Sequence, residues 1–155
     1  MIQSGMTDAL PPAPAPSAIL EATLYAEDLD LAEAFYGKLL GLECIQRIGE
    51  RHVFFRVGPA VLLIFNPHKT VLPPSNPRLP VPAHGAHGHG HVCFTLDRDA
   101  IEAMRLRLAA ANVTIDTAFD WPNGARSLYV RDPAGNSVEF AEGWLWGAAE
   151  SDSVA

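Results

Sequence analysis

ILEATLYA, residues 19–26, and GHVCFTL, residues 90–96, decide the fold of this chain, because both alternate between an apolar face and a chemically mixed face. A period of two residues is the pattern of a half-buried β-strand. The mixed face carries Glu21, Thr23 and Tyr25 in the first strand and His91, Cys93 and Thr95 in the second. The two stretches are therefore interpreted as one structural element that occurs twice.

Acidic residues and an amphipathic helix follow each of these strands. Asp30 with Glu33, and Asp99 with Glu102, have the spacing of a capping box and predict the two helix starts. Gly41 predicts the end of the first helix. The apolar stripes expected to face a sheet are Leu31, Phe35 and Leu39 in the first helix and Ile101, Met104, Leu108 and Ala111 in the second.

Three further strands are expected after each helix. They fall in residues 41–47 (GLECIQR), 52–57 (HVFFRV) and 60–65 (AVLLIF), then in 112–118 (NVTIDTA), 126–130 (RSLYV) and 136–141 (NSVEFA). Asp132, Pro133 and Gly135 are residue types that a type I turn favours, which predicts a hairpin between the last two strands. The pattern is βαβββ, twice. We predict an α+β fold in which two such modules form a cupped, partly closed mixed sheet with the helices outside.

A module of this size cannot close a hydrophobic core alone, so the modules must pair, either within one chain or across a dimer. The connection between them, residues 66–90, contains six prolines, which predicts that it has no regular structure. The predicted divisions are a disordered proline-rich tail at 1–18, a first module at 19–66, a linker or lid at 67–88, a second module at 89–143 and a C-terminal tail at 144–155.

Charge and composition argue against two kinds of partner. The net charge is -7 and the 11 basic residues are scattered, so no surface that would follow the phosphates of a nucleic acid is expected. The chain has no uninterrupted apolar run of the roughly 18 residues that a membrane-spanning helix needs. Cys44 and Cys93 lack metal-binding or redox spacing and are interpreted as reduced thiols, which favours a cytoplasmic location.

Three side chains on the mixed faces are candidate metal ligands. Glu21 and His91 occupy equivalent positions of the repeat, and Glu139 lies in the last strand between apolar neighbours. A glutamate in an apolar strand is costly unless it is paired, exposed at an edge or bound to a cation. Two carboxylates and one imidazole would satisfy one another around one divalent metal. Taken singly, each glutamate is also explained as a solvated edge residue, and His91 as a hydrogen-bonded structural histidine.

The run HGAHGHGHV, residues 84–92, holds four of the six histidines. Such a run suggests a metal-binding tract or a tag, but the flexibility of its glycines makes a fixed geometry costly in entropy. We expect His84, His87 and His89 to be solvated loop residues, with His89 also a candidate lid residue. Only His91 is expected to point inward from a strand.

The segments LEATLYAEDLDLAEAFYGKLLGLE, GHVCFTLD and RSLYVRDPAGNSVEFAE resemble the vicinal oxygen chelate superfamily over residues 19–143. This superfamily includes glyoxalase I, fosfomycin thiol transferases, extradiol dioxygenases, methylmalonyl-CoA epimerases and bleomycin-resistance proteins. The resemblance implies paired βαβββ modules, usually in a homodimer, with a metal in the cup. It implies that Glu21, His91 and Glu139 are the ligands, and that a further glutamate expected in the last strand of the first module is missing here, where Leu63 stands at or beside its place.

The resemblance also implies a function. We expect a metal-dependent enzyme of the glyoxalase type, a lyase, isomerase or thiol transferase, in which Mn, Fe(II), Zn, Ni or Mg acts as a Lewis acid on a small oxygen-chelating substrate. Glu21 or Glu139 would move a proton. The candidate substrate-binding residues are Thr23, Phe54, Arg56, Arg126, Ser127 and Tyr129. Trp121 is a further candidate for the apolar wall, and both Trp121 and Phe54 are alternatively explained as core residues. The alternative is a metal-free protein of the bleomycin-resistance type that sequesters a small molecule in the same cup.

Overall fold

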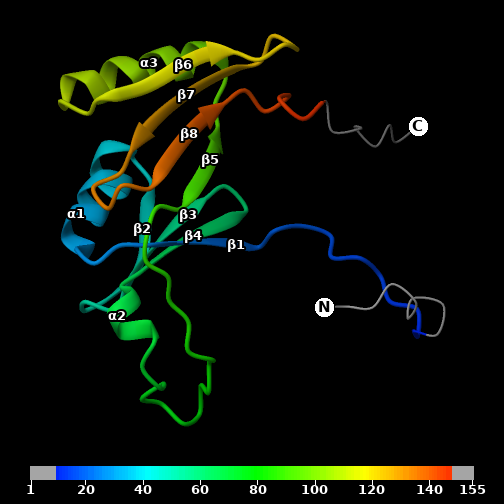
Figure 1. The fold of residues 1–155 in the computed structure, drawn as a ribbon, viewed down its shortest axis with the longest axis vertical. Helices are drawn as coiled ribbons and strands as arrows, with labels where there is room; N and C mark the ends of the chain where they lie inside the picture. The colour runs from blue at the N-terminus through cyan, green and yellow to red at the C-terminus, as the bar shows by residue number, and fades with distance from the viewer. Residues whose placement is uncertain (1–9, 148–155) are drawn as a thin grey trace.

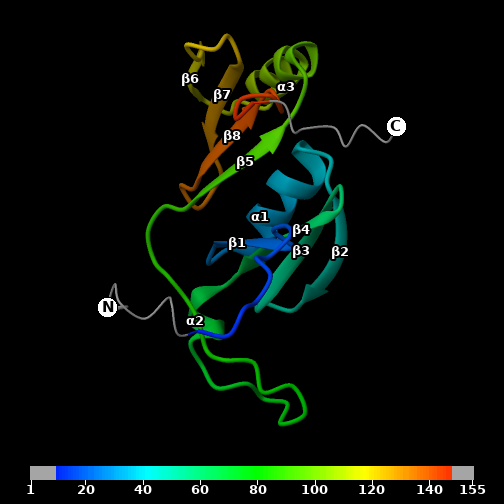
Figure 2. The same cartoon turned by 90° about the vertical axis from the view of Figure 1, so that its right-hand side faces the viewer.

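The structure, a computed structural model, describes residues 10–147. The first module consists of β1 (Glu21–Tyr25), α1 (Leu29–Glu33), the π-helical segment η2 (Ala34–Leu39), β2 (Glu43–Ile48), β3 (His52–Val57) and β4 (Ala60–Phe65). The second consists of β5 (His91–Thr95), α3 (Arg98–Ala110), β6 (Ile115–Asp120), β7 (Arg126–Arg131) and β8 (Ser137–Ala141). The short helix α2 (Pro67–Thr70) lies between the modules in sequence. The two modules lie one above the other in Figure 1 and remain distinct in Figure 2.

Each module contains a four-stranded mixed sheet. The strand orders are β1-β4-β3-β2 and β5-β8-β7-β6. The pairs β1–β4 and β5–β8 are parallel, and the other pairs are antiparallel. These two sheets do not close into a barrel. The prediction of an α+β fold with two βαβββ modules is confirmed.

Both longer helical segments begin two residues earlier than predicted. The Asp28 carboxylate accepts a hydrogen bond from the Leu31 amide at 3.0 Å, and the Asp97 carboxylate accepts one from the Ala100 amide at 2.8 Å. Each aspartate therefore satisfies a backbone N–H that the first helical turn leaves unpaired. The predicted capping boxes at Asp30 and Asp99 are wrong, since these residues lie inside the first turn.

The buried face of the first helix also differs from the predicted stripe. Leu31 is 51% exposed, whereas Leu29, Ala32, Phe35 and Tyr36 are buried. The shift of the helix start and the passage from α1 into the wider η2 turn place different residues against the sheet. In α3 the predicted Ile101 and Leu108 are buried, but Ala111 caps the helix and is exposed. Gly41 has a φ of 79°, as expected of a glycine after a helix end.

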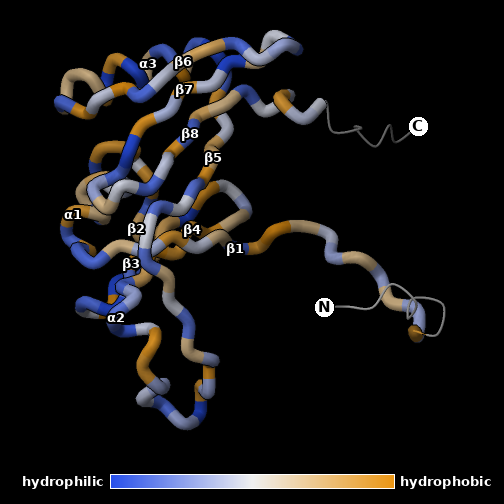
Figure 3. The backbone as a smooth tube through the Cα atoms, in the orientation of Figure 1, coloured by the Kyte–Doolittle hydropathy of each residue, from blue (hydrophilic) through white to orange (hydrophobic). Residues whose placement is uncertain are grey.

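One hydrophobic core receives side chains from both modules. The apolar faces of the strands and helices supply it, and Leu24 of β1 and Phe94 of β5 both belong to it. Hydrophobic and hydrophilic positions are interspersed along the strands (Figure 3). The opposite, mixed faces of β1 and β5 stay open, because Glu21, Thr23, His91 and Cys93 are exposed.

A buried polar network holds the two modules together. The Tyr36 hydroxyl of the first module donates to Asp132 Oδ2 of the second at 2.7 Å. The Asn136 side chain donates to the Tyr25 carbonyl at 3.1 Å and accepts from the Gly90 amide at 2.7 Å. The Gly135 amide donates to the Asp132 carbonyl at 2.9 Å, which confirms the predicted turn between β7 and β8. The module junction is thus built on this turn.

The connection between the modules contains one helical turn, α2, capped by the Asn66 side chain. The prediction that residues 66–90 lack regular structure is therefore wrong at Pro67–Thr70, because proline is well tolerated in the first turn of a helix. The rest of the connection extends away from the sheets as a long loop (Figure 1). Residues 1–9 and 148–155 of the predicted tails lie outside the described residues. None of the described helices is both long enough and apolar enough to cross a bilayer.

Candidate functional site

Glu139 occupies the middle of the mixed face of the second sheet. It pairs in register with Cys93 of the parallel strand β5 and with Tyr129 of the antiparallel strand β7. Its neighbours Val138 and Phe140 point the other way, into the core. Only 5% of Glu139 is exposed. A carboxylate in this position needs partners, because burial removes it from water.

The first partner of Glu139 is His91. The imidazole Nε2 of His91 lies 3.2 Å from Glu139 Oε2. The other ring nitrogen, Nδ1, lies 3.1 Å from the Ser137 carbonyl oxygen. Nδ1 also lies 3.2 Å from the Ser137 hydroxyl oxygen. When the ring is neutral and Nδ1 donates its proton to the Ser137 carbonyl, the Nε2 lone pair and the Glu139 carboxylate are placed as two ligands of one cation.

The second partner of Glu139 is Ser127. The Ser127 hydroxyl donates to Glu139 Oε1 at 2.7 Å and accepts from the Trp121 indole N–H at 2.8 Å. Ser127 is fully buried. Ser127 therefore positions the carboxylate. It was predicted to contact a substrate, but its hydroxyl is buried and hydrogen-bonded to Glu139 and Trp121. Trp121, predicted as wall or core, orients Ser127.

Two further groups beside Glu139 have raised pKa values. Although the Cys93 residue is partly open to solvent, neighbouring side chains desolvate its thiol, and this desolvation, followed by the nearby Glu139 charge, raises the pKa of Cys93 to about 12. Burial, followed by a hydrogen bond to Glu139, raises the pKa of the Tyr129 hydroxyl to about 12. Both groups are therefore protonated at neutral pH, when they can donate hydrogen bonds towards the carboxylate or a ligand.

The first sheet presents an apolar counterpart of this arrangement. Thr23 pairs with Leu63, and Leu63 pairs with Phe54, in the register that Cys93, Glu139 and Tyr129 have in the second module. Leu63 thus stands where the second module has its buried glutamate. Glu21, at the start of β1, is exposed and occupies the place that His91 has in β5.

A single chain does not bring the three predicted ligands together. His91 and Glu139 meet, but within residues 10–147 the ligand atoms of Glu21, His91 and Glu139 do not all come within 4.8 Å of one another. The separation follows from the fold, because Glu21 belongs to one sheet and the other two residues belong to the other.

The other residues predicted to bind substrate lie in different environments, from an aromatic wall to an exposed strand. Phe54 stacks on His52 with ring centroids 4.0 Å apart and forms part of an aromatic wall. Arg56 is exposed on β3, at the level of Val61. Arg126 forms an ion pair with Asp120 at 3.2 Å, which offsets its charge. Thr23 is exposed on the open face of β1.

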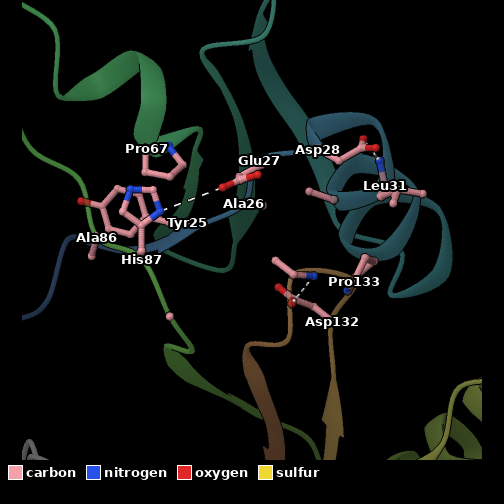
Figure 4. Close-up of a pocket in the computed structure, with 13 residues that line it drawn as sticks. Tyr25, Ala26, Glu27, Asp28, Leu31, Pro67, Ala86, His87, Asp132 and Pro133 are labelled. Carbon is pink, nitrogen blue, oxygen red and sulfur yellow. Dashed lines mark hydrogen bonds and ion pairs between the residues drawn. The ribbon is translucent and has the colours of Figure 1, made fainter.

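A second group of ligand-type side chains, which the sequence analysis did not predict, lies at the other end of β1. Glu27, His68 and His87 have ligand atoms within 4.8 Å of one another. Figure 4 shows Glu27 and His87 pointing toward each other. Both residues line a pocket of about 290 Å³, which Asp132 and Pro133 also line. The histidine run was a signal for this site, but nothing in the sequence linked it to Glu27 or His68.

The geometry defines a class of protein: two βαβββ modules, each with an open mixed face, and a histidine and a buried glutamate paired on one of them. The family model described as the Glyoxalase/Bleomycin resistance protein/Dioxygenase superfamily matches residues 18–140. The chain therefore belongs to this superfamily, which is the vicinal oxygen chelate superfamily.

Solved structures agree with this assignment. A lactoylglutathione lyase from Agrobacterium tumefaciens is 46% identical, with a TM-score of 0.81, over 86% of this chain and 98% of that one. A glyoxalase/bleomycin resistance protein/dioxygenase from Nocardioides is 22% identical, with a TM-score of 0.65, over 90% and 91% of the two chains. A glyoxalase/dioxygenase from Nostoc punctiforme is 18% identical, with a TM-score of 0.61, over 86% and 97%. The last two show the fold alone. A search of curated proteins found no significant match.

Proposed function

We propose that this protein is a glyoxalase-like, metal-dependent enzyme that acts on a small substrate with adjacent oxygen atoms, as a lyase, isomerase or thiol transferase. The observation that carries the proposal is the pair formed by His91 and Glu139, whose Nε2 and Oε2 atoms lie 3.2 Å apart on an open sheet face. The 46% identity to a lactoylglutathione lyase supports the same class.

The donor set fits a divalent metal. The Ser137 carbonyl lies 3.1 Å from Nδ1 of His91 and orients the ring, and the Ser127 hydroxyl holds the Glu139 carboxylate, so both candidate ligands are oriented by neighbours in the way that metal ligands usually are. Imidazole and carboxylate donors suit Mn, Fe(II), Zn, Ni or Mg. Such an ion would supply Lewis acidity to a substrate oxygen on which negative charge develops.

The protein side chains would provide the proton chemistry and the substrate contacts. Glu139, a buried carboxylate on the open sheet face, would accept or return a proton, and Glu21 would do so from the facing module. Tyr129 is protonated at neutral pH and would donate a hydrogen bond to a substrate oxygen. Phe54, Thr23 and Arg56 would line the facing wall, which is mainly apolar.

The proposal includes a homodimer, in which Glu21 of the partner subunit completes the site. Both mixed sheet faces are open in one chain, and its own Glu21 does not reach His91 and Glu139. Ile19 and Leu20, which lead into β1, are 81% and 75% exposed. A second copy that packs its first sheet against the second sheet would cover these surfaces.

Elemental analysis of the purified protein tests the metal, and an assay for lactoylglutathione formation or cleavage tests the reaction. We expect His91→Ala to abolish activity and to remove the metal held at Glu139, because an imidazole ligand is lost. The matched control is His89→Ala, which changes an exposed histidine two residues away.

Metal affinity should also fall in acid, because protons compete for the imidazole and the carboxylates. If activity and metal content survive in His91→Ala, the site is wrong, and a metal-free protein would instead support a binding role.

Subunit mixing tests the shared site. Glu21→Ala and His91→Ala are each expected to be inactive as homodimers. In a mixed dimer one of the two sites keeps both residues, so random mixing should restore about a quarter of the wild-type activity. A site built within one chain would give no restoration.

A further inference from the structure

Glu27, His68 and His87 form a cluster that is separate from the His91–Glu139 pair. Glu27 follows the end of β1, His68 lies in α2, and His87 lies in the loop that returns to β5. Glu27 Oε1 is 2.8 Å from His68 Nε2 and 4.0 Å from His87 Nδ1, and the two imidazole rings are 5.2 Å apart. Segments from three parts of the chain thus bring two imidazoles and one carboxylate together.

These distances fit a single transition-metal ion. Ligand atoms that sit about 2.0–2.2 Å from a tetrahedral zinc ion are roughly 3.4 Å from one another. Glu27 Oε1 lies 2.8 Å from one imidazole nitrogen and 4.0 Å from the other, on both sides of this value, and all three ligand atoms lie within 4.8 Å of one another. Small rotations of exposed side chains would therefore bring all three donors to one ion and leave a fourth position for water. Nitrogen donors favour zinc, cobalt or nickel over magnesium or calcium.

The backbone under the cluster is fixed without a metal. The Ala26 amide donates to the Phe65 carbonyl at 2.9 Å, and the Asn66 side chain accepts from the His68 amide at 3.1 Å. The His84 amide donates to the Thr70 carbonyl at 3.0 Å, which joins the returning loop to α2. These bonds set the positions of Glu27, His68 and His87 before any ion arrives, which lowers the entropy that binding would cost.

Close packing fixes the returning loop further. A Cβ atom on Gly85 would come within 2.6 Å of a Val71 methyl and 3.2 Å of the Pro67 carbonyl oxygen, so the loop lies against α2 where only glycine fits. The Tyr25 hydroxyl lies 2.7 Å from His84 Nδ1 and ties the same loop to β1. His87 is therefore presented to Glu27 by a packed segment, although its own side chain is exposed.

We propose that Glu27, His68 and His87 form a second divalent metal site, specific for zinc-like transition metals, that clips the connection between the modules to the end of β1. The ion would join the two ends of the long loop between α2 and β5. Because β5 begins just after this loop, the clip would also steady the strand that carries His91. The inference does not depend on the proposed function, since it uses none of the same ligands.

Zinc titration of metal-stripped protein, followed by calorimetry and elemental analysis, tests the proposal in a background that lacks the other site. The double variant His91→Ala/Glu139→Gln should still bind one zinc ion per chain. Adding His68→Ala, His87→Ala or Glu27→Gln to it should remove that ion or weaken its binding at least about tenfold. The control is His89→Ala, which changes a histidine of the same run that lies outside the cluster. Adding it to the double variant should leave the zinc ion bound.

Two further measurements identify the site. Cobalt bound in the double variant should give the visible spectrum of a four-coordinate ion, and the His87→Ala change should abolish it. Zinc should also slow hydrogen exchange of the amides in residues 84–88 in the double variant.

The proposal is overturned if the double variant binds no zinc, or if zinc binds equally well when His68→Ala, His87→Ala or Glu27→Gln is added to the double variant. Failure of the proposed function appears separately, as wild-type protein that binds no more metal than the double variant.

Discussion

His91 and Glu139 lie on the neighbouring parallel strands β5 and β8, with the imidazole Nε2 3.2 Å from the carboxylate Oε2. The two residues are not register partners, because His91 pairs with Ser137 and Glu139 pairs with Cys93. Their side chains meet diagonally across the sheet, where residues two positions apart on one strand share a face.

Ser127→Ala should loosen the pair. The change removes the hydrogen bonds of Ser127 to Glu139 and to the Trp121 indole, and leaves two buried polar groups without this partner. We expect a loss of about 1–3 kcal/mol in the free energy of unfolding, measured by urea denaturation. Metal affinity should fall about tenfold, because the carboxylate is no longer held. The control is Thr117→Ala on β6, an exposed hydroxyl, and an equal loss in both variants would contradict the positioning role.

Leu63→Glu should add a ligand to the first module. Leu63 is 7% exposed and stands where the second module has Glu139. An added carboxylate there should raise the affinity for nickel or zinc by about tenfold in the dimer and lower the stability of the metal-free protein by about 1–3 kcal/mol. Thermal melting with and without metal measures both effects. The control is Leu63→Gln, because a glutamine side chain has the shape of glutamate without its charge. This variant should be less stable than the wild type and should show no gain in metal affinity.

Cys93 should be a slow nucleophile despite its exposure. Its raised pKa, about 12, leaves the thiol protonated at pH 8, and only the thiolate is alkylated. In a Cys44→Ser background, iodoacetamide should modify Cys93 slower than free cysteine by roughly three orders of magnitude at pH 8, the ratio of their thiolate fractions, with a rate that rises toward pH 12. Since the Glu139 charge is one cause of the shift, Glu139→Gln should speed the reaction. Mass spectrometry of the alkylated peptide follows it, and unchanged reactivity in Glu139→Gln would remove Glu139 as a cause.

Tyr36→Phe should weaken the junction of the modules. The Tyr36 hydroxyl donates to Asp132. Burial, followed by the Asp132 charge and this hydrogen bond, raises the pKa of Tyr36, so the hydroxyl stays protonated. Its loss should cost about 1–3 kcal/mol in the free energy of unfolding. A double-mutant cycle with Asp132→Asn isolates the pair, and a coupling near zero would mean that the hydrogen bond does not hold the modules together.

The sequence alone determined the repeated strand and helix order, because a period of two and a period near 3.6 are local properties of the chain. Residues 52–57 and 60–65 are strands with the predicted bounds, and the turn at Asp132 forms as expected. The helix starts were misplaced by two residues, because Asp28 and Asp97 compete for the same role as Asp30 and Asp99, and the packing of the helix on its sheet selects between them.

Only the tertiary structure decided which side chains meet. The alternation in the strands predicted that His91 and Glu139 share a face, but not that their atoms lie in contact or that Ser127 is buried behind them. Glu27, His68 and His87 are far apart in the sequence, and hydrogen bonds of the connecting loop bring them together. Local patterns encode the period and face of each element, whereas contacts between distant residues depend on how the elements pack, which no local pattern specifies.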